Sequence, residues 1–171
     1  LPRYSSVLPA ETNITLRLTN KINLKVPFFS SAMDTVTESS MAIAMANAGG
    51  IGVIHRNLEI RYQSAEILKV KKKKLIVGAA IGTNEEDIER AKSLLDCGAD
   101  LLVIDTAHGH SAKVLKVLSK IKKLKTKAAI CVGNIATGEA AKELYNSGAD
   151  IIKVGIGPGS ICTTRMVAGI G

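Results

Sequence analysis

Aromatic residues are scarce in this sequence: its 171 residues include three tyrosines, two phenylalanines and no tryptophan. The core of such a chain must be built from Ile, Leu, Val and Ala, a composition typical of parallel sheets that are buried on both faces. The length allows one domain with a sizeable core. No apolar run reaches the roughly 18 residues that a membrane-spanning helix needs, which argues against a membrane protein built on such helices.

Cysteine is also scarce, and its pattern argues against two common uses. Cys97, Cys131 and Cys162 are odd in number and form no Cys-x-x-Cys pair, so neither a disulfide framework nor a zinc site is expected. Free thiols fit a reducing cytosol, and we expect a cytoplasmic protein. The opening Leu1-Pro-Arg-Tyr4 has neither an initiator methionine nor a signal-peptide pattern, which suggests that the sequence starts inside a longer protein.

Positive charge dominates, with a formal net charge of +8, and lysines cluster at 69–74 and 113–127. A basic surface can bind nucleic acid without sequence preference. No aromatic residues are interleaved with these lysines, although single-stranded binders use aromatic stacking. Nucleic-acid binding is therefore disfavoured as the main function. A non-catalytic fragment that binds nucleic acid or another partner remains an alternative, and a phosphorylated small substrate would suit the charge equally well.

Short apolar runs alternate with helical patterns along most of the chain. A hairpin is expected within 14–26, where Ile14, Leu16 and Leu18 alternate with polar residues. Six apolar strands follow at roughly 25-residue spacing, at 27–33, 51–55, 75–81, 101–105, 128–132 and 151–154. The turn Cys97-Gly-Ala-Asp100 before the fourth strand is repeated as Ser147-Gly-Ala-Asp150 before the sixth. The repeat indicates equivalent β-α units, which require parallel strands with right-handed crossovers.

Polar or glycine residues follow every one of these strands, and this favours a barrel over a doubly wound sheet. They are Ser31, Asn57, Gly82, Asp105, Asn134 and Gly157. Sites gathered from all strand ends are typical of (β/α)8 barrels, whereas a doubly wound sheet uses one switch point and a Gly-x-Gly-x-x-Gly turn that is absent after the first strand. We predict an α/β protein with the (β/α)8 TIM-barrel fold, of which about six β-α units are present in a single, incomplete domain, 1–171.

Helix boundaries are predicted from local signals. Thr35-x-x-Glu38 and Thr83-x-x-Glu86 have capping-box spacing, and glycines are expected to end the helices. In the helix over 60–69, the pattern places Ala65, Ile67 and Leu68 on the inward face.

The stretch Lys153–Arg165 leaves the sixth strand and breaks into Gly155, Gly157, Pro158 and Gly159. Glycines allow backbone N–H groups to close on an anion or carbonyls to turn onto a cation. Cys162 follows directly, with Arg165 three residues on. Oriented N–H donors and a guanidinium favour the thiolate, which is the nucleophilic form. The alternative is a small buried cysteine, which suits Cys131 in its apolar strand better.

Four segments carry a family resemblance: Phe29–Val36, Asp105–Ser111, Gly133–Thr137 and above all Gly155–Arg165. They resemble the IMP dehydrogenase and GMP reductase family over nearly the whole chain. The His-Gly-His form of the second segment and the continuation Met166–Gly171 are more similar to the dehydrogenase branch. The resemblance implies oxidation of IMP to XMP with NAD through a cysteine adduct, the committed step of guanine nucleotide synthesis. The alternative is GMP reductase, which deaminates GMP with NADPH.

The resemblance also implies roles for individual residues. Cys162 and Thr164 would be catalytic. The IMP site would use Ser31, Met33, Gly159 and Ser160, and the NAD site Asp105, Thr106, Ala107, Asn134, Gly155 and Gly157. Backbone carbonyls of Gly157, Gly159 and Cys162 would bind K⁺ within a homotetramer.

Two expected features of the family are not found within the sequence. A regulatory CBS-type insertion usually stands near 70–75, where only Lys71–Lys74 is present. The mobile flap with its Arg-Tyr pair would follow Gly171, because Arg61-Tyr62 precedes the second barrel helix and is not that pair.

Overall fold

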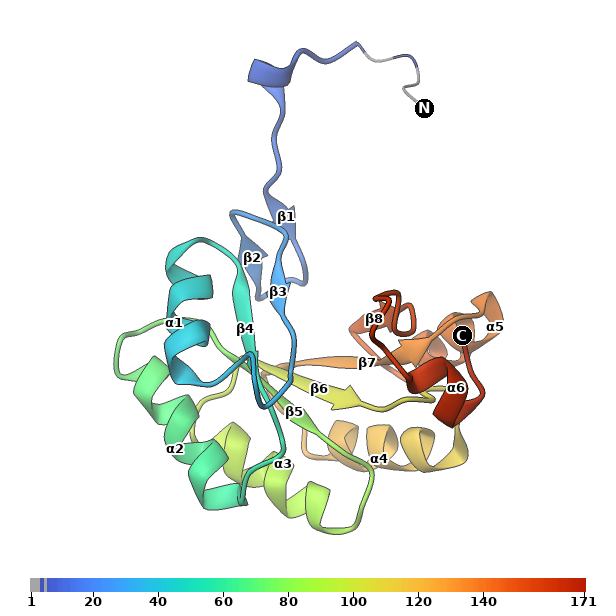
Figure 1. The fold of residues 1–171 in the computed structure, drawn as a ribbon. Helices are drawn as coiled ribbons and strands as arrows, with labels where there is room; N and C mark the ends of the chain where they lie inside the picture. Colours follow the sequence, from blue (N-terminus) through green and yellow to red (C-terminus); the bar gives the residue numbers. More distant parts are fainter. Residues whose placement is uncertain (1–3, 5) are drawn as a thin grey trace.

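A computed structural model describes residue 4 and residues 6–171 and shows an α/β fold (Figure 1). Of the opening segment Leu1-Pro-Arg-Tyr4, the first three residues lie outside the described residues. Six strands form one parallel sheet in sequential order, the arrangement that right-handed β-α units produce. The strands are β3 (Phe29–Ser30), β4 (Ile51–Ile54), β5 (Gly78–Ile81), β6 (Leu101–Asp105), β7 (Ala129–Ile135) and β8 (Ile151–Val154). The curved sheet confirms the prediction of a partial TIM barrel.

Five helices connect these strands and lie on the same face of the sheet (Figure 1). They are α1 (Ser39–Asn47), α2 (Ile60–Lys71), α3 (Glu86–Asp96), α4 (Ala112–Lys123) and α5 (Gly138–Asn146). A short helix, α6 (Thr164–Ala168), follows β8, and a 3₁₀ turn, η1 (Pro9–Glu11), lies near the N-terminus. None of the helices among the described residues combines the length and apolar character that crossing a membrane requires.

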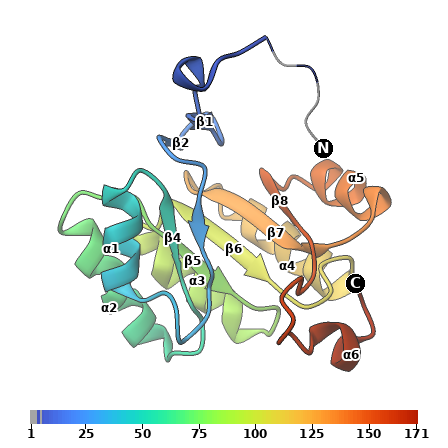
Figure 2. The same cartoon turned by 45° about the horizontal axis from the view of Figure 1, so that its top comes forward.

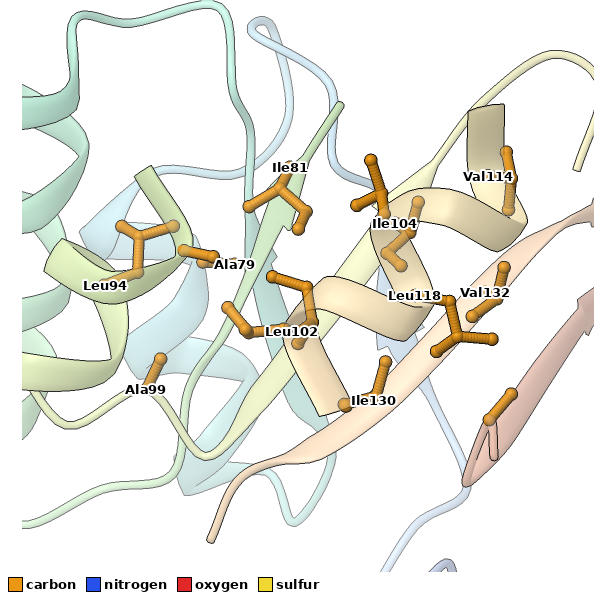
Figure 3. Close-up of a cluster of buried hydrophobic side chains, with 14 of the residues drawn as sticks. Ala79, Ile81, Leu94, Ala99, Leu102, Ile104, Val114, Leu118, Ile130 and Val132 are labelled. Carbon is orange, nitrogen blue, oxygen red and sulfur yellow. The ribbon is translucent and has the colours of Figure 1, made fainter. Parts of the chain in front are cut away.

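Alternate residues of β4 to β8 belong to two separate hydrophobic clusters, because successive side chains in a strand point to opposite faces. On the outer face, Leu102 and Ile104 of β6 pack with Leu118 of α4 and are fully buried. Figure 3 shows side chains of α4 lying over β6 and β7. On the inner face, Leu101 and Val103 belong to a smaller cluster. Both faces therefore bury apolar residues, as the near-continuous apolar runs predict.

The expected hairpin closes one end of the inner face. Strands β1 (Leu16–Arg17) and β2 (Asn23–Leu24) pair antiparallel. Ile22 and Leu24 are buried in the inner cluster, which also holds the first residues of β4, β6 and β7. The hairpin thus covers the amino-terminal end of the inner face and leaves the carboxyl end available for a site.

The repeated Gly-Ala-Asp turn links each helix to the neighbouring strand. Gly98 and Gly148 have φ values of 90° and 95°, a left-handed conformation that glycine adopts without a Cβ clash. Asp100 Oδ2 accepts a hydrogen bond from the N–H of Val77, and Asp150 Oδ2 accepts one from the N–H of Ile130, both at 2.9 Å. In each case the aspartate satisfies a backbone donor near the start of the adjacent strand.

Both predicted capping boxes are wrong. At the first, a side chain distant in sequence replaces the predicted cap, and at the second a different local residue accepts the hydrogen bond. Helix α1 begins at Ser39 without a local side-chain cap; instead the Ser39 N–H donates to Glu66 Oε2 of α2 at 2.8 Å. Burial opposes ionisation of Glu66, but hydrogen bonds from Lys69 and Ser39 outweigh it and lower the pKa of that carboxyl. At α3, Asp87 rather than Glu86 accepts a backbone hydrogen bond, from the N–H of Asn84 at 2.9 Å.

The inward face predicted for α2 is only partly right. Ile67 is fully buried, but Leu68 is 44% exposed and Ala65 is also exposed. Gln63 is buried instead, because its amide donates to Ala80 O at 2.8 Å and accepts from Arg90 at 2.8 Å. A polar network between α2, α3 and β5 thus occupies a face that apolar periodicity assigns to other residues.

Candidate active site

A cavity of about 260 Å³ lies on the inner face of the sheet. Its walls are mostly apolar and come from the hairpin, from the central strands and from the two edge strands. They include Leu18, Ser31, Val103, Cys131, Ile151 and Lys153. Because parallel strands all point the same way, the loops after β3, β6, β7 and β8 meet at one end of the sheet, and α6 lies beyond the arrowhead of β6 (Figure 2). In barrels this carboxyl end is where active sites form.

The loop after β8 brings a thiol close to its own backbone. Gly157 has a φ of 40°, and a Cβ at this position would collide with Cys162 Sγ. The Cys162 N–H donates to Gly159 O at 3.1 Å, and Arg165 Nε donates to Ile156 O at 3.0 Å. Only glycine at position 157 allows this approach, so the predicted glycine turn shapes the setting of the thiol.

Several contacts favour the thiolate form of Cys162. Its Sγ lies 3.2 Å from Thr164 Oγ1. Hydrogen bonds from the side chain and the backbone of Thr164 lower the pKa of the thiol; burial opposes them, and the charge of Arg165 adds to the lowering. A lowered pKa at an accessible cysteine is the property of a nucleophile at neutral pH.

Cys131 has the opposite setting on the inner face of β7. Burial raises the pKa of this thiol to about 12, and the charge of Asp105 adds to that effect while Lys153 opposes it. Cys97 is a half-buried free thiol at the end of α3. Of the three cysteines, only Cys162 combines a lowered pKa with the glycine loop.

Three of the predicted cofactor residues, Asp105, Thr106 and Asn134, lie at the ends of β6 and β7. Asp105 Oδ1 accepts a hydrogen bond from Lys153 Nζ of β8 at 3.0 Å. The hydroxyl of Thr106 donates to Gly133 O at 2.8 Å, and the Asn134 N–H donates to Thr106 O at 2.8 Å. These bonds join the loops after β6 and β7. Asn134 Oδ1 is buried without a hydrogen-bond partner, so it is free to accept a donor from a ligand.

The predicted substrate residues Ser31 and Met33 lie on the turn that follows β3, and both are exposed. Ser31 and Lys153 line the same cavity, so the turn after β3 and the Asp105–Lys153 pair share one edge of it. Within the described residues, no hydrogen bond joins this turn to the loop of Cys162. The predicted residues therefore form three groups at one end of the sheet, two of them sharing the cavity.

The remaining predicted residues lie on the same loops. Ala107 is exposed after β6, and Gly155 follows β8 with its N–H donated to Ile135 O at 2.8 Å. Ser160 is exposed in the glycine loop, within two residues of Cys162. Ala107, Gly155 and Ser160 thus lie on loops that leave the carboxyl ends of β6 and β8.

Sequence reasoning missed Lys153 and Thr37. Lys153 stands inside a strand, and nothing in its neighbourhood along the chain shows that its amine reaches Asp105 on β6. Thr37 is fully buried, with its hydroxyl 2.6 Å from Ser31 O. Thr37 stands in the mostly polar run Asp34–Ser40, so no pattern along the chain distinguishes it from its exposed neighbours.

Comparison with known proteins gives a family. The family model for the IMP dehydrogenase / GMP reductase domain matches residues 1–171. The chain is similar to the inosine-5'-monophosphate dehydrogenase of Cryptosporidium parvum, with 45% identity over 100% of this chain and 53% of the relative. It is 42% identical to the enzyme of the same name from Borreliella burgdorferi, over 100% of the chain and 55% of the relative.

The chain spans about half the length of these curated relatives. A third relative, the inosine-5'-monophosphate dehydrogenase of Aquifex aeolicus, is 31% identical over 100% of the chain and 61% of its own length. That alignment covers 299 positions for a chain of 171 residues, a difference of 128. The larger relatives thus contain inserted residues that have no counterpart here.

Proposed function

The chain belongs to the IMP dehydrogenase / GMP reductase family, and from this premise we propose that it is the nucleophile-bearing part of an IMP dehydrogenase. The complete enzyme would oxidise IMP to XMP with NAD, the committed step of guanine nucleotide synthesis. The observation that carries the proposal is the loop of Cys162, with its lowered thiol pKa and its position at the carboxyl end of the sheet.

Cys162 would act as a covalent nucleophile. Its thiolate adds to C2 of the purine ring, hydride leaves from the same carbon, and water later displaces the thiolate to give the product. The hydroxyl of Thr164, 3.2 Å from Sγ, would hold the thiolate before attack and would contact the water that follows. NAD, when bound, would accept the hydride.

The nucleotide and the cofactor would bind on the loops around this thiol. Ser31, Met33, Gly159 and Ser160 are proposed to hold IMP. Asp105, Thr106, Ala107, Asn134, Gly155 and Gly157 are proposed for NAD. The residues fit this role, because the unpartnered Asn134 Oδ1 can accept an amide hydrogen bond, and nicotinamide carries such an amide. Asp105 already accepts from Lys153, which fixes its carboxylate at the edge of the cavity.

A monovalent cation and further subunits belong to the same proposal. Backbone carbonyls of Gly157, Gly159 and Cys162 come from one tight loop and are neutral oxygen donors, the kind that can replace the hydration shell of K⁺. Gly159 O already accepts the Cys162 N–H, so cation binding would act on the residue that bears the thiol. Three carbonyls do not complete a coordination shell, and a neighbouring subunit of a cytoplasmic homotetramer would supply other ligands.

The proposal is tested with the full-length protein that contains this chain. Incubation with IMP and NAD, followed by acid quenching and peptide mass spectrometry, should find a purine nucleotide on the Cys162 peptide. The Cys131 peptide of the same sample is the internal control and should stay unmodified. A full rate of NADH formation by the Cys162→Ser variant would refute covalent catalysis at this residue.

The reductase is the alternative within the family, and the same preparation separates the two. NADH formation with IMP and NAD supports the dehydrogenase, whereas NADPH consumption with GMP supports the reductase. The segment Met166–Gly171 and the His-Gly-His sequence after Asp105 favour the dehydrogenase, and so do the names of the relatives compared above.

A further inference from the structure

Thr37 is a fully buried polar residue beside the proposed nucleotide site. It lies between β3 and α1, on the turn that also carries Ser31 and Met33. A buried hydroxyl destabilises the fold unless it is hydrogen-bonded, so its partners show what the residue is for. None of the roles proposed above is assigned to it.

The hydroxyl of Thr37 contacts the start of the turn at two points. Oγ1 lies 2.6 Å from Ser31 O and 2.8 Å from Ser30 Oγ. A hydroxyl has one proton and a carbonyl can only accept, so Thr37 donates to Ser31 O, and Ser30 is the donor in the second contact. The backbone conformation of Ser31 is therefore held by a side chain six residues further on.

The backbone of Thr37 closes the turn and attaches it to β4. Its N–H donates to Met33 O at 3.0 Å, and its carbonyl accepts from the His55 N–H at 3.3 Å. A second link joins the same two loops, because Asn57 Nδ2 donates to Asp34 Oδ2 at 3.0 Å. The turn with Ser31 and Met33 is thus attached at two points, Asp34 and Thr37, to the residues that follow β4.

We propose that Thr37 is a positioning residue for nucleotide binding, whose buried hydroxyl holds the Ser31–Met33 turn in its binding conformation, and that the Asn57–Asp34 link supports it. The inference rests on the proposed function, since it assumes that this turn contacts the nucleotide. It assigns no chemical step to Thr37. The residue acts through Ser31 and Met33, so its loss should weaken nucleotide binding more than catalysis once the nucleotide is bound.

Three single variants of the full-length protein test this. Thr37→Val keeps the shape of the side chain but leaves Ser31 O without its buried donor; it should raise the KM for IMP about tenfold, with kcat and the KM for NAD within about threefold. Thr37→Ser keeps the hydroxyl, so its KM for IMP should stay within about threefold of the wild-type value. Thr35→Val is the matched control, because Thr35 is exposed on the same turn, and should behave as wild type.

A folding defect gives a different result from a positioning defect. A variant that merely misfolds loses active enzyme, which lowers apparent kcat and leaves the KM for IMP unchanged. Asn57→Ala provides a second variant in case Thr37→Val does not fold, because Asn57 is exposed; it should raise the KM for IMP about threefold. An unchanged KM for IMP in both Thr37→Val and Asn57→Ala overturns the proposal. A KM for IMP in Thr37→Ser as high as in Thr37→Val overturns it too.

Hydrogen exchange separates this inference from the proposed function. The amides of Val36 and Thr37 donate to Met33 O, and they should exchange faster in Thr37→Val than in wild type or Thr37→Ser. If wild-type protein does not oxidise IMP, the proposed function fails while the exchange comparison still tests the hold on the turn. Equal exchange in all three proteins overturns the positioning role even if the enzyme is active.

Discussion

Strand β7 and the loop after β8 each carry a cysteine, and they place it in opposite environments. In β7, Cys131 is 4% exposed and burial raises its pKa to about 12. In the loop, Cys162 lies beside Thr164 and Arg165, and its pKa is lowered. The strand buries alternate residues on two faces, whereas the loop turns on glycines that keep a thiol accessible. The surrounding backbone, and not the thiol, thus decides which cysteine can react.

The largest expected effect is on the alkylation of the two thiols. At pH 8, a pKa of about 12 leaves roughly 1 in 10⁴ of Cys131 as thiolate, against roughly 1 in 10 for an unperturbed thiol. Iodoacetamide should therefore label Cys162 at least about a thousandfold faster than Cys131, as measured by peptide mass spectrometry over time. The Cys162 rate should rise with pH and level off at a lower pH than that of an unperturbed thiol, because the pKa of Cys162 is depressed.

Unfolding in guanidinium chloride is the control for this comparison. It removes both the burial of Cys131 and the loop around Cys162, so the two rates should converge to within a few-fold. A preference for Cys162 that persisted in the unfolded chain would show that local sequence, and not the fold, sets the difference.

The next largest effect is expected from a methyl group at position 157, which should lower the turnover of the full-length enzyme. The new Cβ of Gly157→Ala would collide with Cys162 Sγ and would occupy a left-handed backbone conformation. We expect a loss of about 100-fold in turnover of the full-length enzyme, since a displacement of about 1 Å can cost that much. Gly138→Ala is the control for this collision, because no atom lies within 4 Å of its Cβ and it begins α5, outside the proposed site; equal losses in both variants would rule out the collision as the cause.

Substitutions on the two faces of β7 should differ in how much they destabilise the protein. Val132 is fully buried under the helices, whereas the neighbouring Cys131 lines the open cavity. Val132→Ala should lower the free energy of unfolding by about 2 kcal/mol, from lost burial and an unfilled cavity. Cys131→Ala should lower it by less than about 1 kcal/mol. Urea titration followed by circular dichroism measures both, and the reverse order would mean that the inner face is as tightly packed as the outer one.

The smallest expected effect concerns the hydroxyl beside the reactive thiol. Thr164→Val removes the side-chain hydrogen bond that contributes most to lowering the pKa of Cys162. The pH profile of Cys162 alkylation should move to higher pH, with a several-fold slower rate at pH 7. Thr164→Ser retains a hydroxyl and should keep the wild-type profile, and an unchanged profile in Thr164→Val would leave the backbone N–H and Arg165 as the causes.

Much of the fold could be predicted from the sequence because its signals are local. The apolar runs, the repeated Gly-Ala-Asp turn and the polar strand ends predicted six parallel β-α units, and the structure confirms them. Helix starts were predicted less well. The cap of α1 comes from Glu66, 27 residues away, and the inward side of α2 carries Gln63 because Arg90 and Ala80 supply its partners.

By itself, the sequence determined the glycine loop, the position of Cys162 after it and the alternation that buries Cys131, because backbone freedom and side-chain period depend on adjacent residues. Only the tertiary structure decided that Lys153 reaches Asp105 across the intervening strand β7, that Thr37 holds Ser31, and that Asn134 keeps a buried oxygen unpartnered. Such pairings depend on strand register and on how loops meet at one end of the sheet. Hydrogen bonds act over about 3 Å in space, and separation along the chain does not fix that distance.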